Sequence, residues 1–177
     1  MSLDIWTGEM HPPEPPRQFS RCDPELGANI LSDMLMVATT QHRYDRDKAG
    51  KPYILHPLKV MYWLKTDDPE LMAIALGHDL IEDHGNEVSY DGLRKLGMTE
   101  RVIEGIRALT KVPGETYEEY KRKVKNNWDA ILVKMQDLRH NSDFRRLKGV
   151  TAKDMERMKR YAEFYNELDE HRKQFTR

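Results

Sequence analysis

The chain has 177 residues, which fits one domain with a sizeable hydrophobic core. Its 29 basic and 30 acidic residues nearly cancel, to a net charge of −1, so no overall field favours nucleic acid or an anionic membrane as a partner. No stretch approaches the roughly 18 consecutive apolar residues of a transmembrane helix. The one cysteine, Cys22, allows no internal disulfide. It fits a reducing compartment, and we expect a cytoplasmic protein.

The N-terminal stretch is rich in proline, at positions 12, 13, 15 and 16. Proline fixes the backbone and lacks an N–H, so a helix is excluded there and an extended conformation is favoured. We therefore expect residues 1–22 to form a tail or a strap lying on the domain. Residues 23–175 are then expected to form the domain itself.

From residue 23 onward the signals are helical almost throughout. A capping residue followed by proline, as in Asp23–Pro24 and Asp68–Pro69, is typical of a helix start, and Thr116 and Thr151 open capping patterns. Helices are predicted over residues 23–43, 57–64, 68–81, 89–96, 99–109, 116–125, 128–146 and 151–173. No alternating apolar pattern indicates a strand, so the predicted fold class is all-α.

The segment LGHDLIED, residues 76–83, places one imidazole and three carboxylates in an otherwise apolar helical region. Residues four apart share a helix face, so His78 is expected over Glu82 and Asp79 over Asp83, both on an inward-facing stripe. Burying ionised side chains without partners costs several kcal/mol or more. The cluster therefore predicts a divalent cation that supplies the missing charge.

Further ligands are expected elsewhere in the chain. His56 precedes Pro57 in GKPYILHP, where the backbone is restricted. Asp137 flanks a buried face in ILVKMQDLRHNSD, and Asn141 follows one turn later. Taken singly, His56 is more often a capping or hydrogen-bonding residue and Asp137 an exposed helix residue. Their combination with the HD pair, in this order, is much more specific for a metal site.

The three motifs KAGKPYILHP, ALGHDLIED and LVKMQDLRHNSD resemble the hydrolase domain of RelA/SpoT-type alarmone enzymes and of small stand-alone alarmone hydrolases. These belong to the HD-domain phosphohydrolase superfamily. The resemblance covers residues 23–168 and implies a helical bundle around a divalent metal, typically Mn²⁺. The implied metal ligands are His56, His78, Asp79 and Asp137.

The resemblance also implies an activity: removal of the 3′-pyrophosphate from guanosine 3′,5′-bis(diphosphate) or its pentaphosphate analogue by metal-bound hydroxide. Glu82 and Asp83 would position or deprotonate the attacking water and assist the leaving group. The implied substrate contacts are Arg46, Lys48, Asn141 and Tyr161, with Arg43 or Arg139 as further candidates for neutralising the diphosphates. The expected partner is a small nucleotide, and the sequence specifies no oligomeric state. We expect hydrolysis alone, because 177 residues leave no room for a synthetase domain.

Two alternatives stay open. Asp47 stands where the family usually has a basic residue, so another nucleotide, such as a nucleoside mono- or triphosphate or another alarmone, could be the substrate. A helical binding protein with a structural metal or none is the other reading, although Glu82 and Asp83 would then have no evident task. His42 matches no metal position of the family and could equally be a packed helix residue.

Overall fold

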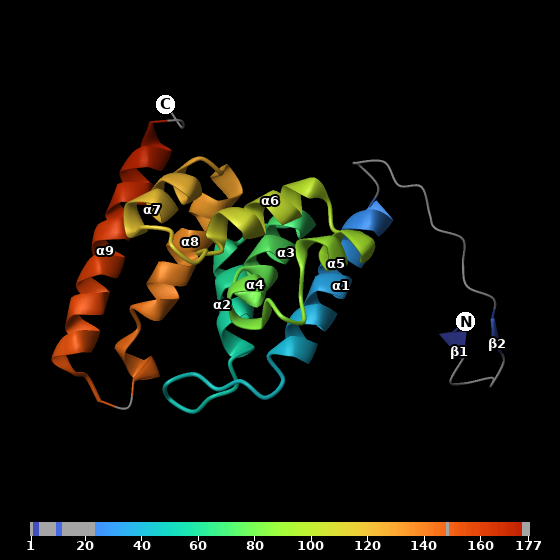
Figure 1. Ribbon diagram of the computed structural model, residues 1–177, viewed down its shortest axis with the longest axis horizontal. Helices are drawn as coiled ribbons and strands as arrows, with labels where there is room; N and C mark the ends of the chain where they lie inside the picture. The colour runs from blue at the N-terminus through green and yellow to red at the C-terminus, as the bar shows by residue number, and fades with distance from the viewer. Residues whose placement is uncertain (1, 4–9, 12–23, 148, 175–177) are drawn as a thin grey trace.

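The computed structural model describes residues 2–3, 10–11, 24–147 and 149–174, with side chains from residue 29 onward. Its fold class is all-α, as predicted (Figure 1). The helices are α1 (Pro24–Gln41), α2 (Leu55–Leu64), α3 (Pro69–Gly77), α4 (Leu80–His84), α5 (Tyr90–Lys95), α6 (Glu100–Leu109), α7 (Tyr117–Lys125), α8 (Trp128–Asn141), the 3₁₀ turn η1 (Phe144–Arg146) and α9 (Ala152–Lys173). Two short strands, β1 (Ser2–Leu3) and β2 (Met10–His11), pair antiparallel.

Helix α3 lies at the centre of the bundle and contacts α1, α2, α6 and α8 (Figure 1). Leu71 and every residue from Ala73 to Gly77 are buried. A helix that is apolar on all sides is stable only when other helices surround it. The chain continues from this central helix directly into the HD pair, so the fold carries that pair into the interior.

Two glycines allow the close helix packing around α3. A Cβ on Gly77 would lie 2.8 Å from Cδ1 of Ile106 in α6 and 2.9 Å from Sδ of Met34 in α1. A Cβ on Gly105 in α6 would lie 2.5 Å from Cδ1 of Ile74. All three distances are too short for a real Cβ contact, so a side chain at either position would push the helices or the core side chains apart.

Three predicted helix starts, at Asp68, Thr116 and Thr151, are confirmed, whereas α2 begins at Leu55 and not at the predicted residue 57. The Asp68 side chain accepts hydrogen bonds from the backbone N–H groups of Glu70 and Leu71 at the start of α3. Thr116 and Thr151 each form a complete capping box with the acidic residue three positions later. The cap predicted at Asp23 lies outside the described residues, and so does most of the tail expected over residues 1–22. That domain boundary stays a prediction.

The helix predicted over residues 68–81 is wrong in its length. Helix α3 ends at Gly77, a turn follows at His78 and Asp79, and α4 begins at Leu80. Nδ1 of His78 turns back to the carbonyl oxygen of Ala75 at 2.8 Å, which competes with regular helix continuation. His78 and Glu82 therefore do not stack as neighbours four apart on one continuous helix.

Two smaller expectations also need correction. The helix predicted over residues 128–146 ends at Asn141, because the hydroxyl of Ser142 binds the carbonyl oxygen of Leu138 and a separate 3₁₀ turn follows. The strands β1 and β2, which no alternating pattern predicts, are only two residues long each.

Within the described ranges, no helix is long and apolar enough to span a lipid bilayer.

Candidate metal centre

The four predicted ligands come from three separate segments and meet at one point. His56 is the second residue of α2, His78 and Asp79 form the turn after α3, and Asp137 lies on the buried face of α8. Nε2 of His56 lies 3.1 Å from Oδ1 of Asp137 and 3.5 Å from Oδ2 of Asp79. Nε2 of His78 lies 3.1 Å from Oδ2 of Asp79 and 3.8 Å from Oδ1 of Asp137. Adjacent ligands of one ion lie about 3 Å apart when each bond is about 2.1 Å long.

Hydrogen bonds at the far side of each imidazole fix its orientation. Nδ1 of His78 donates to the carbonyl oxygen of Ala75, which directs Nε2 toward the carboxylates of Asp79 and Asp137. Nδ1 of His56 lies 2.6 Å from Nδ1 of His140, and the two rings stack with centroids 4.9 Å apart. Such outer contacts select the tautomer in which Nε2 faces a metal.

The two carboxylates are also held by neighbouring side chains. The hydroxyl of Tyr53 donates a 2.5 Å hydrogen bond to Oδ2 of Asp79. Lys134 donates to Oδ2 of Asp137 at 2.8 Å, and the amide of Asn141 donates to Oδ1 at 2.6 Å. Burial by itself would raise the pKa values of both carboxyl groups. The charge of His78 nevertheless holds the pKa of Asp79 well below its usual range, and the charge of Lys134 does the same for the pKa of Asp137. Both groups are therefore ionised acceptors.

The donor atoms fit a divalent transition metal. Nε2 of His78 is buried and forms no hydrogen bond of acceptable geometry with the described residues, although Oδ2 of Asp79 lies close to it. Burial lowers the pKa of His78, but the charges of Asp79 and Asp137 outweigh it and raise that pKa to about 10. A nitrogen that holds a positive charge between the carboxylates of Asp79 and Asp137 is a position where a cation can replace the proton. That these four residues bind a metal stays a prediction.

Glu82 and Asp83 lie on α4 and are exposed, so the expectation that they extend an inward stripe is wrong. The break between α3 and α4 turns them away from the core and into a cavity that Asp79 also lines. Oε2 of Glu82 accepts a 3.0 Å hydrogen bond from the backbone N–H of Lys111. Partial enclosure and then the charge of Asp79 raise the pKa of the Asp83 carboxyl.

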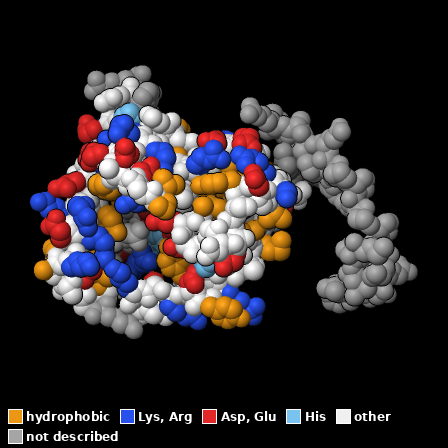
Figure 2. Space-filling model, viewed as in Figure 1, with side chains coloured by type: hydrophobic (Ala, Val, Ile, Leu, Met, Phe, Trp, Pro, Cys, Tyr) orange, Lys and Arg blue, Asp and Glu red, His pale blue; other side chains and the backbone are white. Residues whose placement is uncertain are grey.

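Asp79 and Asp137 of the predicted metal cluster line a hollow of about 390 Å³. A second hollow, of about 360 Å³, shares four lining residues with the first. The first contains Asp79, Glu82, Asp83 and Asp137, and the second lies toward the loop before α2. All four predicted substrate contacts line the second hollow: Arg46, Lys48, Asn141 and Tyr161. Figure 2 shows Lys and Arg side chains gathered on this face beside α8 and α9. Their roles in substrate binding stay predictions.

The further basic candidates lie elsewhere. Arg139 packs over the ring of Trp63, 4.3 Å from its centroid, and Arg43 packs over Tyr44. Neither arginine lines the two hollows described here. Asp47 does line the second hollow, but its Oδ1 accepts hydrogen bonds from the backbone N–H groups two and four residues later, both at 2.9 Å. It closes the turn of this loop.

Sequence reasoning missed several side chains that shape the site. Tyr53 stands three residues before His56 in a motif that was already singled out, but its contact with Asp79 depends on the tertiary fold. Lys134 lies one helical turn before Asp137, a spacing that favours an ion pair. The remaining basic residues that line the first hollow are Lys111, Arg157 and Arg160.

The fold and the site together define an all-α protein with a His/Asp cluster suited to a divalent metal. No family model matches the chain. Among curated proteins, the GTP pyrophosphokinase of Myxococcus xanthus is 27% identical over 137 residues, which are 74% of this chain. The bifunctional (p)ppGpp synthase/hydrolase SpoT of Escherichia coli K12 is 29% identical over 67% of the chain. The guanosine-3′,5′-bis(diphosphate) 3′-pyrophosphohydrolase of Aquifex aeolicus is 30% identical over 56%.

These matches confirm the resemblance to RelA/SpoT-type (p)ppGpp synthase/hydrolase proteins. The similarity is confined to one part of those proteins, since the matched region is only 15–18% of their length. Their names include both synthetic and hydrolytic activities.

Proposed function

We propose that this chain is a metal-dependent phosphohydrolase that removes the 3′-pyrophosphate from guanosine 3′,5′-bis(diphosphate) and its pentaphosphate analogue. The observation that carries the proposal is the convergence of His56, His78, Asp79 and Asp137 at the edge of a cavity with basic walls. The relatives support the substrate class, because several are named for hydrolysis or synthesis of (p)ppGpp.

The four clustered side chains would hold the cation, and we propose Mn²⁺ because mixed imidazole and carboxylate donors suit such an ion. When bound, the ion lowers the pKa of a coordinated water and polarises a phosphoryl oxygen. Tyr53 and Lys134 support the site by orienting the carboxylates of Asp79 and Asp137, respectively.

Glu82 and Asp83 take different parts in this proposal. Asp83 has a raised pKa, which suits a group that accepts a proton from the attacking water and returns it to the leaving oxygen. Glu82 is anchored by the backbone N–H of Lys111 and keeps its other oxygen available to orient that water. Both acids line the same hollow as the metal cluster.

The basic walls suit a substrate with two separate diphosphates. Lys111, Arg157 and Arg160 line the hollow beside the metal cluster, where the 3′-diphosphate would lie. Lys48 and Arg146 line the adjoining hollow, where the rest of the nucleotide would lie. Cationic side chains at the departing pyrophosphate stabilise the charge that develops as the P–O bond breaks.

Asp47 favours a second candidate function. It places a carboxylate in the hollow that would hold the nucleoside, where the family usually has a basic residue. Its Oδ2 lies 3.7 Å from Nε of Arg146, so it also offsets part of the local positive charge. The second candidate is therefore hydrolysis of another nucleotide at the same metal site.

The test is release of pyrophosphate from guanosine tetraphosphate, measured with Mn²⁺, after chelation and after Mn²⁺ is restored. We expect turnover that chelation removes and Mn²⁺ restores. A parallel panel of nucleoside mono- and triphosphates separates the two candidates. Turnover of a panel member, with none for the tetraphosphate, would leave the second candidate and exclude the first.

The matched variants are Asp83→Asn and, as a control, Asp91→Asn on the exposed surface of α5. Loss of a general acid or base slows a reaction by about 10²–10⁴-fold. We expect a loss of that order in Asp83→Asn with its metal content unchanged, and none in the control. Equal rates for both variants would rule out the role given to Asp83.

A further inference from the structure

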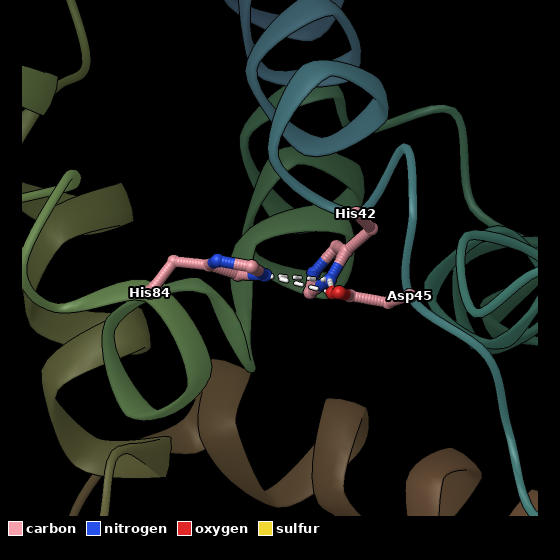
Figure 3. A group of neighbouring side chains, drawn as sticks. All are labelled: His42, Asp45 and His84. Atoms are coloured by element: carbon pink, nitrogen blue, oxygen red, sulfur yellow. Dashed lines mark hydrogen bonds and ion pairs between the residues drawn. The ribbon is translucent and has the colours of Figure 1, made fainter.

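A second group of metal-ligand side chains lies beside the first and is not used in the proposed reaction. His42 follows the last residue of α1, Asp45 lies in the next loop, and His84 ends α4 (Figure 3). Nδ1 of His42 and Nε2 of His84 each lie 2.8 Å from Oδ2 of Asp45, and the two nitrogens are 3.3 Å apart. Three segments of the chain thus direct one donor atom each toward a common point.

We infer that His42, Asp45 and His84 form a second divalent cation site, suited to Zn²⁺. Two imidazoles and one carboxylate with an open fourth position are a ligand set that zinc takes in proteins. With Zn–N bonds of about 2.0–2.1 Å, tetrahedral ligands lie about 3.3 Å apart. The two nitrogens already have that separation, and the two contacts to Asp45, at 2.8 Å each, need to lengthen by about 0.5 Å to match it.

The surroundings of the three side chains support a site that is anchored on one side and open on the other. His42 is 1% exposed, and its Nε2 forms no hydrogen bond with the described residues, so Nδ1 carries the polar interactions of the ring. The side chain of Asp45 is 36% exposed. The remaining coordination position therefore faces water, which gives an ion a route of entry.

Tyr53 separates the two groups. Its ring lies 4.8 Å from the ring of His42, while its hydroxyl donates to Asp79 of the first group. An ion at the second group would tie the end of α1 to the end of α4, the helix that carries Glu82 and Asp83. We expect this second ion to hold Glu82 and Asp83 in place and to take no part in the chemical reaction.

The test is equilibrium dialysis of the full chain against Zn²⁺, followed by elemental analysis. We expect about two ions per chain in the wild type and about one in Asp45→Asn and in His84→Ala. His171→Ala is the matched control, because this histidine lies on α9 and contacts the carbonyl oxygen of Lys125 instead. The control should bind as the wild type does.

Circular dichroism without metal checks that each variant is folded. If only one of Asp45→Asn and His84→Ala folds, its zinc content alone is enough to test the second site. Zn²⁺ should also raise the melting temperature of His78→Ala, in which the first group is broken, but not that of His78→Ala/His84→Ala. Unchanged zinc content in Asp45→Asn and His84→Ala would overturn the second site. One zinc ion bound to His78→Ala and none bound to His78→Ala/His84→Ala would support the second site, even if the first group binds no metal. The second site and the proposed function are therefore tested separately.

Discussion

Tyr53 and Asp79 are joined by a 2.5 Å hydrogen bond from the phenolic hydroxyl to Oδ2. The same oxygen lies 3.1 Å from Nε2 of His78 and 3.5 Å from Nε2 of His56. Tyr53 belongs to the loop before α2, whereas Asp79 lies between α3 and α4. One hydroxyl group from the loop therefore fixes the position of a central donor atom.

Tyr53→Phe should weaken the metal site and leave the fold intact. Loss of an outer hydrogen bond to a metal ligand lowers metal affinity by about 10–100-fold. We expect the Mn²⁺ concentration for half-maximal turnover to rise by about that factor, with turnover at saturating Mn²⁺ much less affected. The matched control is Tyr62→Phe, whose side chain is exposed on α2. An unchanged Mn²⁺ requirement in Tyr53→Phe would argue against this role.

Lys134→Met should destabilise the protein, because it leaves the buried carboxylate of Asp137 without its cation. Breaking a fully buried pair costs about 3–5 kcal/mol. The side chain of Lys134 is 18% exposed, so we expect about 2 kcal/mol in the free energy of unfolding measured with urea in metal-free buffer. Lys159→Met removes an exposed pair on α9 and should change it by less than about 0.5 kcal/mol. Similar losses in both variants would contradict the prediction.

Gly105→Ala should destabilise the packing of α6 against α3, because the new Cβ would lie 2.5 Å from Cδ1 of Ile74. Overpacking of this kind costs about 1–3 kcal/mol in the free energy of unfolding. Ile74→Val removes that methyl group, so the double variant should lose less stability than the sum of the two single variants. Simple additivity in this cycle would show that the contact is not the cause.

Tyr120 should make the protein less stable at alkaline pH. Its hydroxyl donates to the carbonyl oxygen of Leu109, and burial raises its pKa to about 12. An unfolded tyrosine ionises near pH 10, so between about pH 10 and 12 the folded state binds more protons than the unfolded state. The free energy of unfolding must then fall as the pH rises through this range, by about 2 kcal/mol from this group.

Urea unfolding at a series of alkaline pH values measures this effect. In Tyr120→Phe the fall should be smaller than in the wild type by about that amount, although the variant also loses a hydrogen bond at every pH. Tyr62→Phe, whose side chain is exposed, should retain the wild-type slope. If Tyr120→Phe also retained it, Tyr120 would not be the group responsible.

The parts of the fold that depend on local chemistry could be predicted from the sequence. Asp68, Thr116 and Thr151 cap helices as expected, because a capping bond is formed within three residues. The break at His78 and Asp79 could not be predicted in this way, since LGHDLIED has ordinary helical periodicity. The imidazole of His78 hydrogen-bonds to the carbonyl oxygen of Ala75 and so favours a turn at this point. The packing of the surrounding helices accommodates that turn.

Part of the candidate site could also be predicted from the sequence, and part of it could not. The motif order indicated that His56, His78, Asp79 and Asp137 lie near one another, and the structure brings them together. The approach of His42 to His84 depends on the contact between α1 and α4, which no spacing in the sequence specifies. Asp47, by contrast, closes its own loop through backbone N–H groups only two and four residues later, a local pattern that aspartate favours in turns.

The central claim is that one divalent cation is held jointly by His56, His78, Asp79 and Asp137. Its most direct test is anomalous diffraction at the manganese absorption edge from crystals grown with Mn²⁺. The account predicts an anomalous peak within about 2.0–2.2 Å of both Nε2 atoms and of an oxygen from each aspartate. Crystals with these side chains well ordered and no anomalous peak among them, at a saturating Mn²⁺ concentration, would contradict it.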